Sequence, residues 1–175
     1  RSHNMPYEVV AFEKNEEVLQ AYEAGRCDAY TTDASGLYAE RLKLQNPDDH
    51  MILPEIISKE PLGPAVRQGD DKWFNVVKWT LFALLDAEEL GITKANVDEK
   101  KTSDNPEIKR LLGTEGDFGT GVGLTNDWAY NIIKQVGNYG EIFDANVGPS
   151  TKLGIARGLN NLWSKGGIQY APPIR

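Results

Sequence analysis

At 175 residues, with 40% hydrophobic and 26% charged residues, the chain has the composition of one ordinary globular domain or of parts of two. The net charge of −7 argues against nucleic acid as a partner, because phosphate binding depends on clustered lysine and arginine. No apolar run approaches the roughly 20 residues that are needed to cross a bilayer, so direct membrane insertion is not expected.

Cysteine and histidine are too few for the common metal sites. Cys27 is the only cysteine, which rules out an internal disulfide and a zinc site built on several thiolates. We interpret Cys27 as a small buried hydrophobic residue. His3 and His50 lie far apart in the chain, without helical or hairpin spacing between them. We therefore expect no metal site.

The amino-terminal stretch "RSHNMPYEVVAF" does not resemble a natural start. It has no initiator methionine, no apolar signal region and no evident tag. Residues 1–5 instead have the character of a helix end that runs into a strand. We therefore expect this chain to be a fragment of a longer protein.

The first 60 residues alternate between strand and helix patterns. A β-forming run over residues 7–12 precedes a helix that Asn15 is expected to cap and Gly25 to end. A second strand is expected over residues 28–32 and a second helix over residues 34–44. This alternation predicts an α/β fold in which helices flank a parallel sheet.

Residues 51–67 change character. Two extended stretches, 51–57 and 62–67, are interrupted by Pro54, Pro61, Gly63 and Pro64. Proline excludes a helix interior and is poorly tolerated in a central strand. The pattern favours a segment that crosses between two lobes, and a long edge hairpin is the alternative.

The strongest helical pattern of the chain follows. Asp70 or Asp71 is expected to cap it, and Gly91 lies just past its end. Its apolar residues recur at helical spacing and are expected to face the core: Trp73, Val77, Leu81, Leu84 and Leu85.

The remaining residues are mostly helical in pattern. A polar connector over residues 96–105 leads to a short helix that Asn105 and Pro106 start and Gly113 ends. Two more helices are expected, over residues 128–135 and 151–164. The tail "GGIQYAPPIR" is expected to be extended.

The glycine-rich stretch "GTEGDFGTGVG", residues 113–123, does not fit a cofactor site. A dinucleotide fingerprint needs its glycines directly after a strand and at the opening of a helix, and this stretch follows a helix instead. No P-loop occurs either, so we interpret the stretch as a flexible surface loop and expect no cofactor. Neither histidine has a nucleophile in a catalytic motif, and no carboxylate is marked out as a general acid or base. An enzyme is therefore not expected.

Asp33 lies between the second predicted strand and the second predicted helix. One interpretation is a helix cap, in which the carboxylate accepts hydrogen bonds from the first backbone N–H groups of the helix. The other rests on position, since ligands of open α/β sheets bind beyond the carboxyl ends of the strands. A carboxylate there can pair with an ammonium group through charge-assisted hydrogen bonds.

Around Asp33, the stretch "AYEAGRCDAYTTDASGLYAERL" resembles the second lobe of periplasmic substrate-binding proteins of polar amino-acid ABC transporters. The later "LPEIISKEPLGPAVRQGDDKWFNVVKW" is similar to their return strand and long amphipathic helix. The residues from 113 onward are similar to the general L-amino-acid branch of that family. The resemblance covers nearly the whole chain.

This resemblance implies a two-lobed periplasmic-binding-protein fold, of which the chain holds only a part. Residues 1–57 would be part of the second, ligand-binding lobe, residues 58–68 a hinge that contains Pro61, Gly63 and Pro64, and residues 69–175 a helical part that packs on the first lobe. Asp33 matches the aspartate that binds the ligand's α-ammonium group, and Thr32 is a second candidate. The arginine and the threonine-bearing loop that hold the α-carboxylate lie upstream and are absent.

The implied function is capture of an L-amino acid by cleft closure in the periplasm, followed by delivery to the transporter's permease. The alternatives are a cyclohexadienyl-dehydratase-like enzyme and a sensory ligand-binding module, which share the fold. Cys27 would have lost a disulfide partner with the missing part, as a further hypothesis. An incomplete sheet edge can pair with another chain, so a dimer of the fragment is a further hypothesis.

Overall fold

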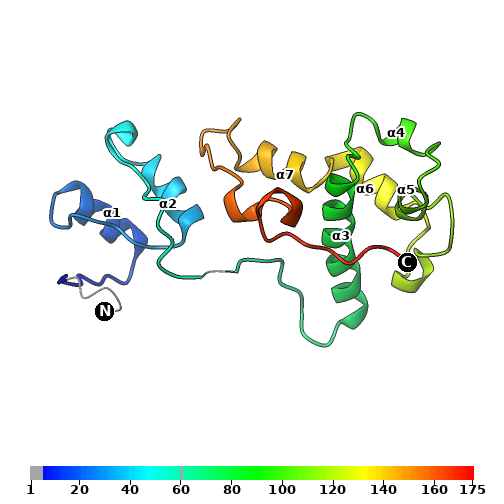
Figure 1. Cartoon of the computed structure of the whole chain (residues 1–175). Helices are drawn as coiled ribbons and strands as arrows, with labels where there is room; N and C mark the ends of the chain where they lie inside the picture. The colour runs from blue at the N-terminus through cyan, green and yellow to red at the C-terminus, as the bar shows by residue number, and fades with distance from the viewer. Residues whose placement is uncertain (1–5, 60) are drawn as a thin grey trace. The chain divides into compact units, whose positions relative to one another are not determined.

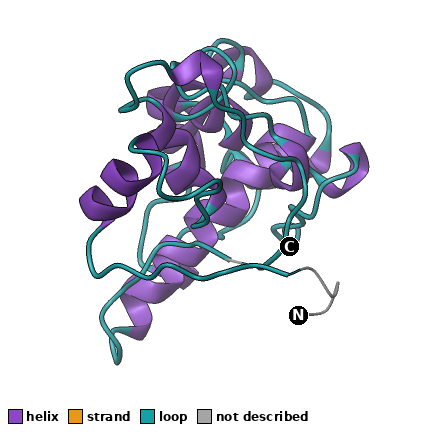
Figure 2. Ribbon diagram, turned by 90° about the vertical axis from the view of Figure 1, so that its left-hand side faces the viewer, coloured by secondary structure: helices purple, strands orange, loops and turns teal. Residues whose placement is uncertain are grey.

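The computed structural model describes residues 6–59 and 61–175. The chain divides into two compact units, Arg1–Glu60 and Pro61–Arg175, and Figure 1 follows the chain through both. The expected helix end at residues 1–5, with His3, lies outside the described residues. Within the described residues, helices and 3-10 turns are the regular structure, and the β-structure amounts to one isolated parallel bridge between Leu162 and Gln169 (Figure 2).

The first unit contains two helices, α1 (Asn15–Glu23) and α2 (Ala34–Arg41), and one 3-10 turn, Pro47–Asp49. The predicted strands over residues 7–12 and 28–32 are wrong as strands, because neither segment is hydrogen-bonded into a sheet among the described residues. A strand exists only through the ladder that it forms with a neighbour. Both segments therefore have no regular secondary structure.

The helix ends of the first unit follow the predictions in part. Gly25 follows the end of α1 with φ of +70°, as expected for a residue after a helix. The N-cap position of α1 is Lys14 instead of Asn15, and the Asn15 side-chain oxygen accepts a hydrogen bond from the Tyr30 hydroxyl at 3.1 Å. α2 ends at Arg41, before the predicted Leu44.

The second unit is built around α3 (Asp71–Glu89), as Figure 1 shows in green. α5 (Pro106–Leu111), α6 (Trp128–Val136) and α7 (Tyr139–Asn146) pack against α3, and α4 (Val97–Lys100) packs against α6. Three 3-10 turns complete the unit: Thr120–Val122, Gly158–Asn160 and Trp163–Lys165.

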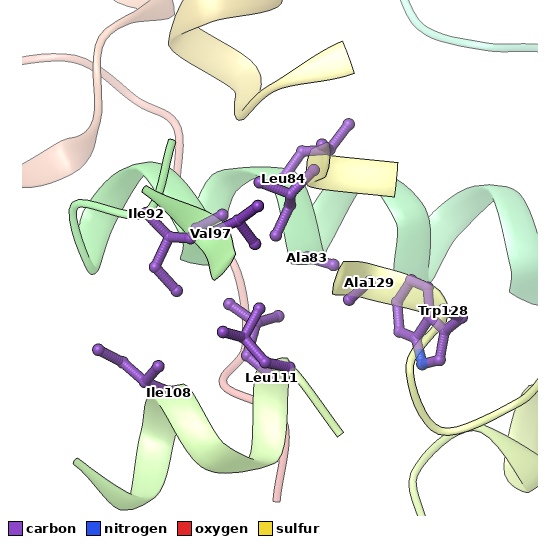
Figure 3. Packing of buried hydrophobic residues seen from close by; sticks show 11 residues of the cluster. Ala83, Leu84, Ile92, Val97, Ile108, Leu111, Trp128 and Ala129 are labelled. Carbon is purple, nitrogen blue, oxygen red and sulfur yellow. The ribbon is translucent and has the colours of Figure 1, made fainter. Parts of the chain in front are cut away.

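The core of the second unit lies where these helices meet. Its fully or almost fully buried side chains come from α3, α4, α5 and α6 and from the turn after α3 (Figure 3): Ala83, Ala87, Ile92, Val97, Leu111, Leu112, Ala129 and Ile133. Removal of this much apolar surface from water is the main stabilising term for the unit. By contrast, the buried apolar side chains of the first unit's described residues are Ala21 and Leu44.

Two predicted N-caps of the second unit are confirmed. Asp70 Oδ1 accepts a hydrogen bond from the backbone N–H of Trp73 at 3.0 Å, and Asn105 Oδ1 accepts one from Glu107 at 2.9 Å. Pro106 occupies the first turn of α5, where a missing N–H costs no hydrogen bond.

The Asn105 cap leads to a first prediction. Asn105→Ala is expected to lower the free energy of unfolding by about 1 kcal/mol, because the N–H of Glu107 loses its acceptor. Urea unfolding followed by circular dichroism measures the change. Lys72→Ala, at an exposed position in the first turn of α3, serves as the control. An effect of the same size in both variants would contradict a specific capping role.

Two features of the carboxyl-terminal part differ from the predictions. Residues 151–164 do not form the predicted helix, because Gly154 and Gly158 adopt left-handed φ values of +64° and +48° that interrupt helical backbone. The polar connector over residues 96–105 contains α4, whose Asp98 accepts hydrogen bonds from the Tyr130 hydroxyl at 2.6 Å and from Lys134 at 3.0 Å.

Residues 113–123 form a loop, as predicted, and part of it is tightly packed. Gly119 is buried, and its N–H donates to the Asn126 side-chain oxygen at 3.0 Å. Gly113 has φ of +72°, and a Cβ there would collide with the backbone oxygen of Asn126. This glycine is therefore required by local packing.

Candidate functional site

Asp33 occupies the N-cap position of α2 but does not act as a cap. Its backbone has φ of −54° and ψ of 140°, and its side chain accepts no hydrogen bond from the first turn of the helix. No hydrogen bond or ion pair to this carboxylate occurs among the described residues, and the residue is half-buried. The capping interpretation is therefore wrong, and the role of the Asp33 carboxylate in ligand binding stays a prediction.

Thr32 lies beside Asp33 over the first turn of α2. A Cβ placed on Gly36 would lie 3.3 Å from the Thr32 methyl group and 4.0 Å from the Asp33 Cβ. Gly36 therefore leaves room for these two side chains at the end of the helix. The two predicted ligand-binding residues are neighbours in the chain and lie at the start of α2, with Thr32 exposed and Asp33 half-buried.

The three predicted hinge residues fall in a segment without regular structure. Pro61 and Gly63 are exposed, and a Cβ on Gly63 would meet open space. All three belong to the second unit, whereas Asp33 and Thr32 belong to the first. The hinge role of Pro61, Gly63 and Pro64 stays a prediction.

An apolar groove of about 270 Å³ lies along the first half of α3. Pro64, Trp73, Val77 and Leu81 are among the residues that line it. The predicted core stripe is therefore buried only at its carboxyl-terminal end, where Leu84 and Leu85 lie, while Trp73 is 54% exposed. Helical periodicity identifies an apolar face, but it does not tell which part of that face is covered.

Two further findings concern metal ions and membranes. Among the described residues, no group of three or more histidine, cysteine, aspartate or glutamate side chains could hold a metal ion. In the same part of the chain, every helix is too short or too polar to pass through a bilayer.

Several known proteins are similar in sequence to the whole of this chain. No family model matches it. It is 67% identical over its whole length to the general L-amino acid-binding periplasmic protein AapJ of Rhizobium johnstonii. It is 58% identical to the putative amino-acid ABC transporter-binding protein YhdW of Escherichia coli and 56% identical to the glutamate/glutamine/aspartate/asparagine-binding protein BztA of Rhodobacter capsulatus.

A solved structure agrees with these relatives. A periplasmic binding protein of an ABC transporter from Brucella ovis, with glutathione bound, is 63% identical and superposes with a TM-score of 0.90. The match covers 99% of this chain and 55% of that one. Over its whole length, the chain is similar to part of these periplasmic amino-acid-binding proteins.

The chain spans about half the length of the curated relatives it matches, 52% of each. The expected fold, part of a two-lobed periplasmic binding protein, is confirmed by the close superposition on the Brucella ovis protein. All three relatives are named as amino-acid-binding or transporter-binding proteins, and YhdW is named as a putative binding protein of an amino-acid ABC transporter.

Proposed function

We propose that this chain is part of the substrate-binding component of an amino-acid ABC transporter, which captures its ligand in the periplasm and delivers it to the permease. The observation that carries the proposal is the half-buried Asp33 carboxylate, which neither caps α2 nor pairs with a described residue. In a chain 56–67% identical to amino-acid-binding proteins, such a carboxylate suits a ligand's α-ammonium group.

The ligand class follows from what the relatives' names have in common. One relative is named for L-amino acids in general, another for four acidic and amide amino acids, and the solved structure holds glutathione. Glutathione carries a free α-ammonium and α-carboxylate on its γ-glutamyl end. We therefore expect recognition of the L-α-amino-acid head group, with tolerance for the tail. Thr32, next to Asp33, would contribute a hydroxyl to the same head group.

The mechanism is closure of two lobes on the ligand. A ligand that contacts both lobes only in the closed form shifts the population toward that form. Residues 1–57 would belong to the ligand-binding lobe, and residues 58–68 would take up the rotation at Pro61, Gly63 and Pro64. Residues 69–175 would pack on the other lobe, and the exposed groove at Trp73 on α3 is the surface that this packing would cover.

The proposal is tested by Asp33→Asn in the full-length protein that contains this chain. The variant keeps the shape of the side chain and removes its charge, so affinity for the bound amino acid is expected to fall at least tenfold, about 1.4 kcal/mol. Calorimetric titration with L-glutamine, L-glutamate and glutathione measures it. Asp28→Asn, an exposed aspartate nearby, is the control and should bind normally.

A second arm of the experiment changes the ligand. N-acetyl-L-glutamine lacks the positive charge on its α-nitrogen, so the unchanged protein should bind it far more weakly than L-glutamine. Unchanged affinity of Asp33→Asn would contradict the role of Asp33. Conversion of prephenate, without stabilisation by any amino acid, would instead support the dehydratase alternative.

A further inference from the structure

A second pocket lies in the second unit, whereas Asp33 belongs to the first. Its volume is about 230 Å³, and it lies between the end of α3, α5 and residues 163–175. Three carboxylates line it: Asp86 and Glu89 from α3 and Glu107 from α5.

Asp86 is an unusual lining residue because it is buried without a partner. It is only 8% exposed, and its Oδ2 atom is buried with no hydrogen-bond partner among the described residues. Burial of the carboxyl group, with the negative charges of Glu89 and Glu107 nearby, raises its pKa to about 7. A buried polar group of this kind is costly unless something pairs with it.

The mouth of the pocket is aromatic. Trp163 Nε1 donates a hydrogen bond to Glu89 Oε1 at 3.3 Å, which holds the indole beside the carboxylate. The rings of Trp163 and Tyr170 meet edge to face, with centroids 5.8 Å apart. Both side chains are more than half exposed, and Leu111 and Ile174 add apolar walls.

The charges of the pocket restrict what it can bind. The three carboxylates would repel an anion. Their positions do not form a metal site either, since no group of acidic, histidine or cysteine side chains among the described residues could hold a metal ion. Arg175 also lines the pocket but forms no ion pair with a described carboxylate. The guanidinium of Arg110 donates instead to the backbone oxygen of Ile174 at 3.1 Å. Three carboxylates and one arginine therefore line the pocket, so acidic groups are in excess beside its apolar walls.

We propose that this pocket binds a small organic cation, an alkylammonium or alkylguanidinium ion, with Asp86 and Glu89 as its counter-ions. The positive head would lie between the two carboxylates, where charge-assisted hydrogen bonds are strong. The alkyl part would lie against Trp163 and Tyr170, whose ring faces also attract cations. This inference does not depend on the amino-acid site at Asp33.

The test uses the indole N–H of Trp163 as a reporter of the pocket. Its NMR signal is assigned by its loss in Trp163→Phe, and the full-length protein that contains this chain is titrated with n-butylammonium and n-butylguanidinium chloride. We expect a saturable shift of this signal with at least one cation. The neutral 1-butanol should cause no saturable shift, because it lacks the charge.

Matched variants decide the role of the carboxylates. Asp86→Asn and Glu89→Gln should each weaken binding at least tenfold, since each removes a charged partner. Glu99→Gln, an exposed carboxylate on α4, and Asp33→Asn should bind as the unchanged protein does. Should Asp86→Asn fail to fold, Glu89→Gln provides the same comparison. No saturable shift with either cation, or equal binding by 1-butanol, would overturn the proposal.

Discussion

Arg157→Met is expected to lower the free energy of unfolding by about 3 kcal/mol. Arg157 Nη2 lies 3.0 Å from Glu88 Oε2 and 2.9 Å from the backbone oxygen of Asn160. Its guanidinium lies 5.3 Å from the ring centroids of Tyr139 and Phe143. The Glu88 side chain is only 9% exposed, so loss of the arginine leaves a nearly buried carboxylate.

Lys165 is the other cation near this carboxylate, with its Nζ 3.9 Å from Glu88 Oε1, and it retains part of the compensation. Urea unfolding measures the effect. Combination with Glu88→Gln should recover part of the lost stability, because the unpaired charge is then absent. Lys152→Met, an exposed lysine in the same segment, should change stability by less than about 0.5 kcal/mol. Equal losses in both single variants would contradict a specific role for Arg157.

Asp86 is expected to make the protein less stable as the pH rises from about 4 to about 7. Burial raises its pKa from 3.8 to about 7, so over this range the folded chain holds a proton that the unfolded chain has released. The folded state therefore binds more protons, and rising pH favours unfolding. This rise in the pKa of Asp86 corresponds to a loss of a few kcal/mol in the free energy of unfolding, about 4 at most. The charged and titratable groups around it are Glu89, Glu107, Tyr170 and Arg175.

Asp86→Asn isolates this contribution, because an amide stays neutral across the range. The stability of the variant relative to the unchanged chain should rise from pH 4 to pH 7 and then level off above pH 7. Thermal unfolding at half-unit pH steps measures the difference, with Glu99→Gln as the control. Parallel pH profiles for Asp86→Asn and the unchanged chain would show that Asp86 titrates normally. A bound alkylammonium ion should reduce the difference by favouring the charged form of Asp86.

The elements that were predicted well depend on neighbours in the chain. The caps at Asp70 and Asn105 and the helix end at Gly25 are decided within a few residues, because a side chain reaches only the first backbone N–H groups of its own helix. The position of Asp33 at the start of α2 was predicted for the same reason. The sequence did not predict that Asp33 lacks a capping hydrogen bond, because a helix cap and a ligand-binding carboxylate are both compatible with the same residues.

The errors depend on partners that are distant in the chain. Residues 7–12 and 28–32 have β-forming sequences, but a strand forms only when another segment supplies its hydrogen bonds. Residues 151–157, which have no regular structure, hold Arg157 against Glu88, 69 residues away, and no local pattern indicates this contact. α7 begins with a capping box of Asn138 and Glu141 that the sequence contains but that was not recognised.

Local chemistry thus determined several helix ends, the apolar face of α3 and the position of Asp33 at the start of α2. The order and spacing of short motifs indicated a resemblance to periplasmic amino-acid-binding proteins, and the relatives confirmed this resemblance. Tertiary packing decided which part of the α3 stripe is buried, and it placed Asp86 among two other carboxylates and two aromatic rings. The physical reason is that burial and electrostatic environment are sums over residues brought together by folding, whereas capping and periodicity act within a few residues of one helix.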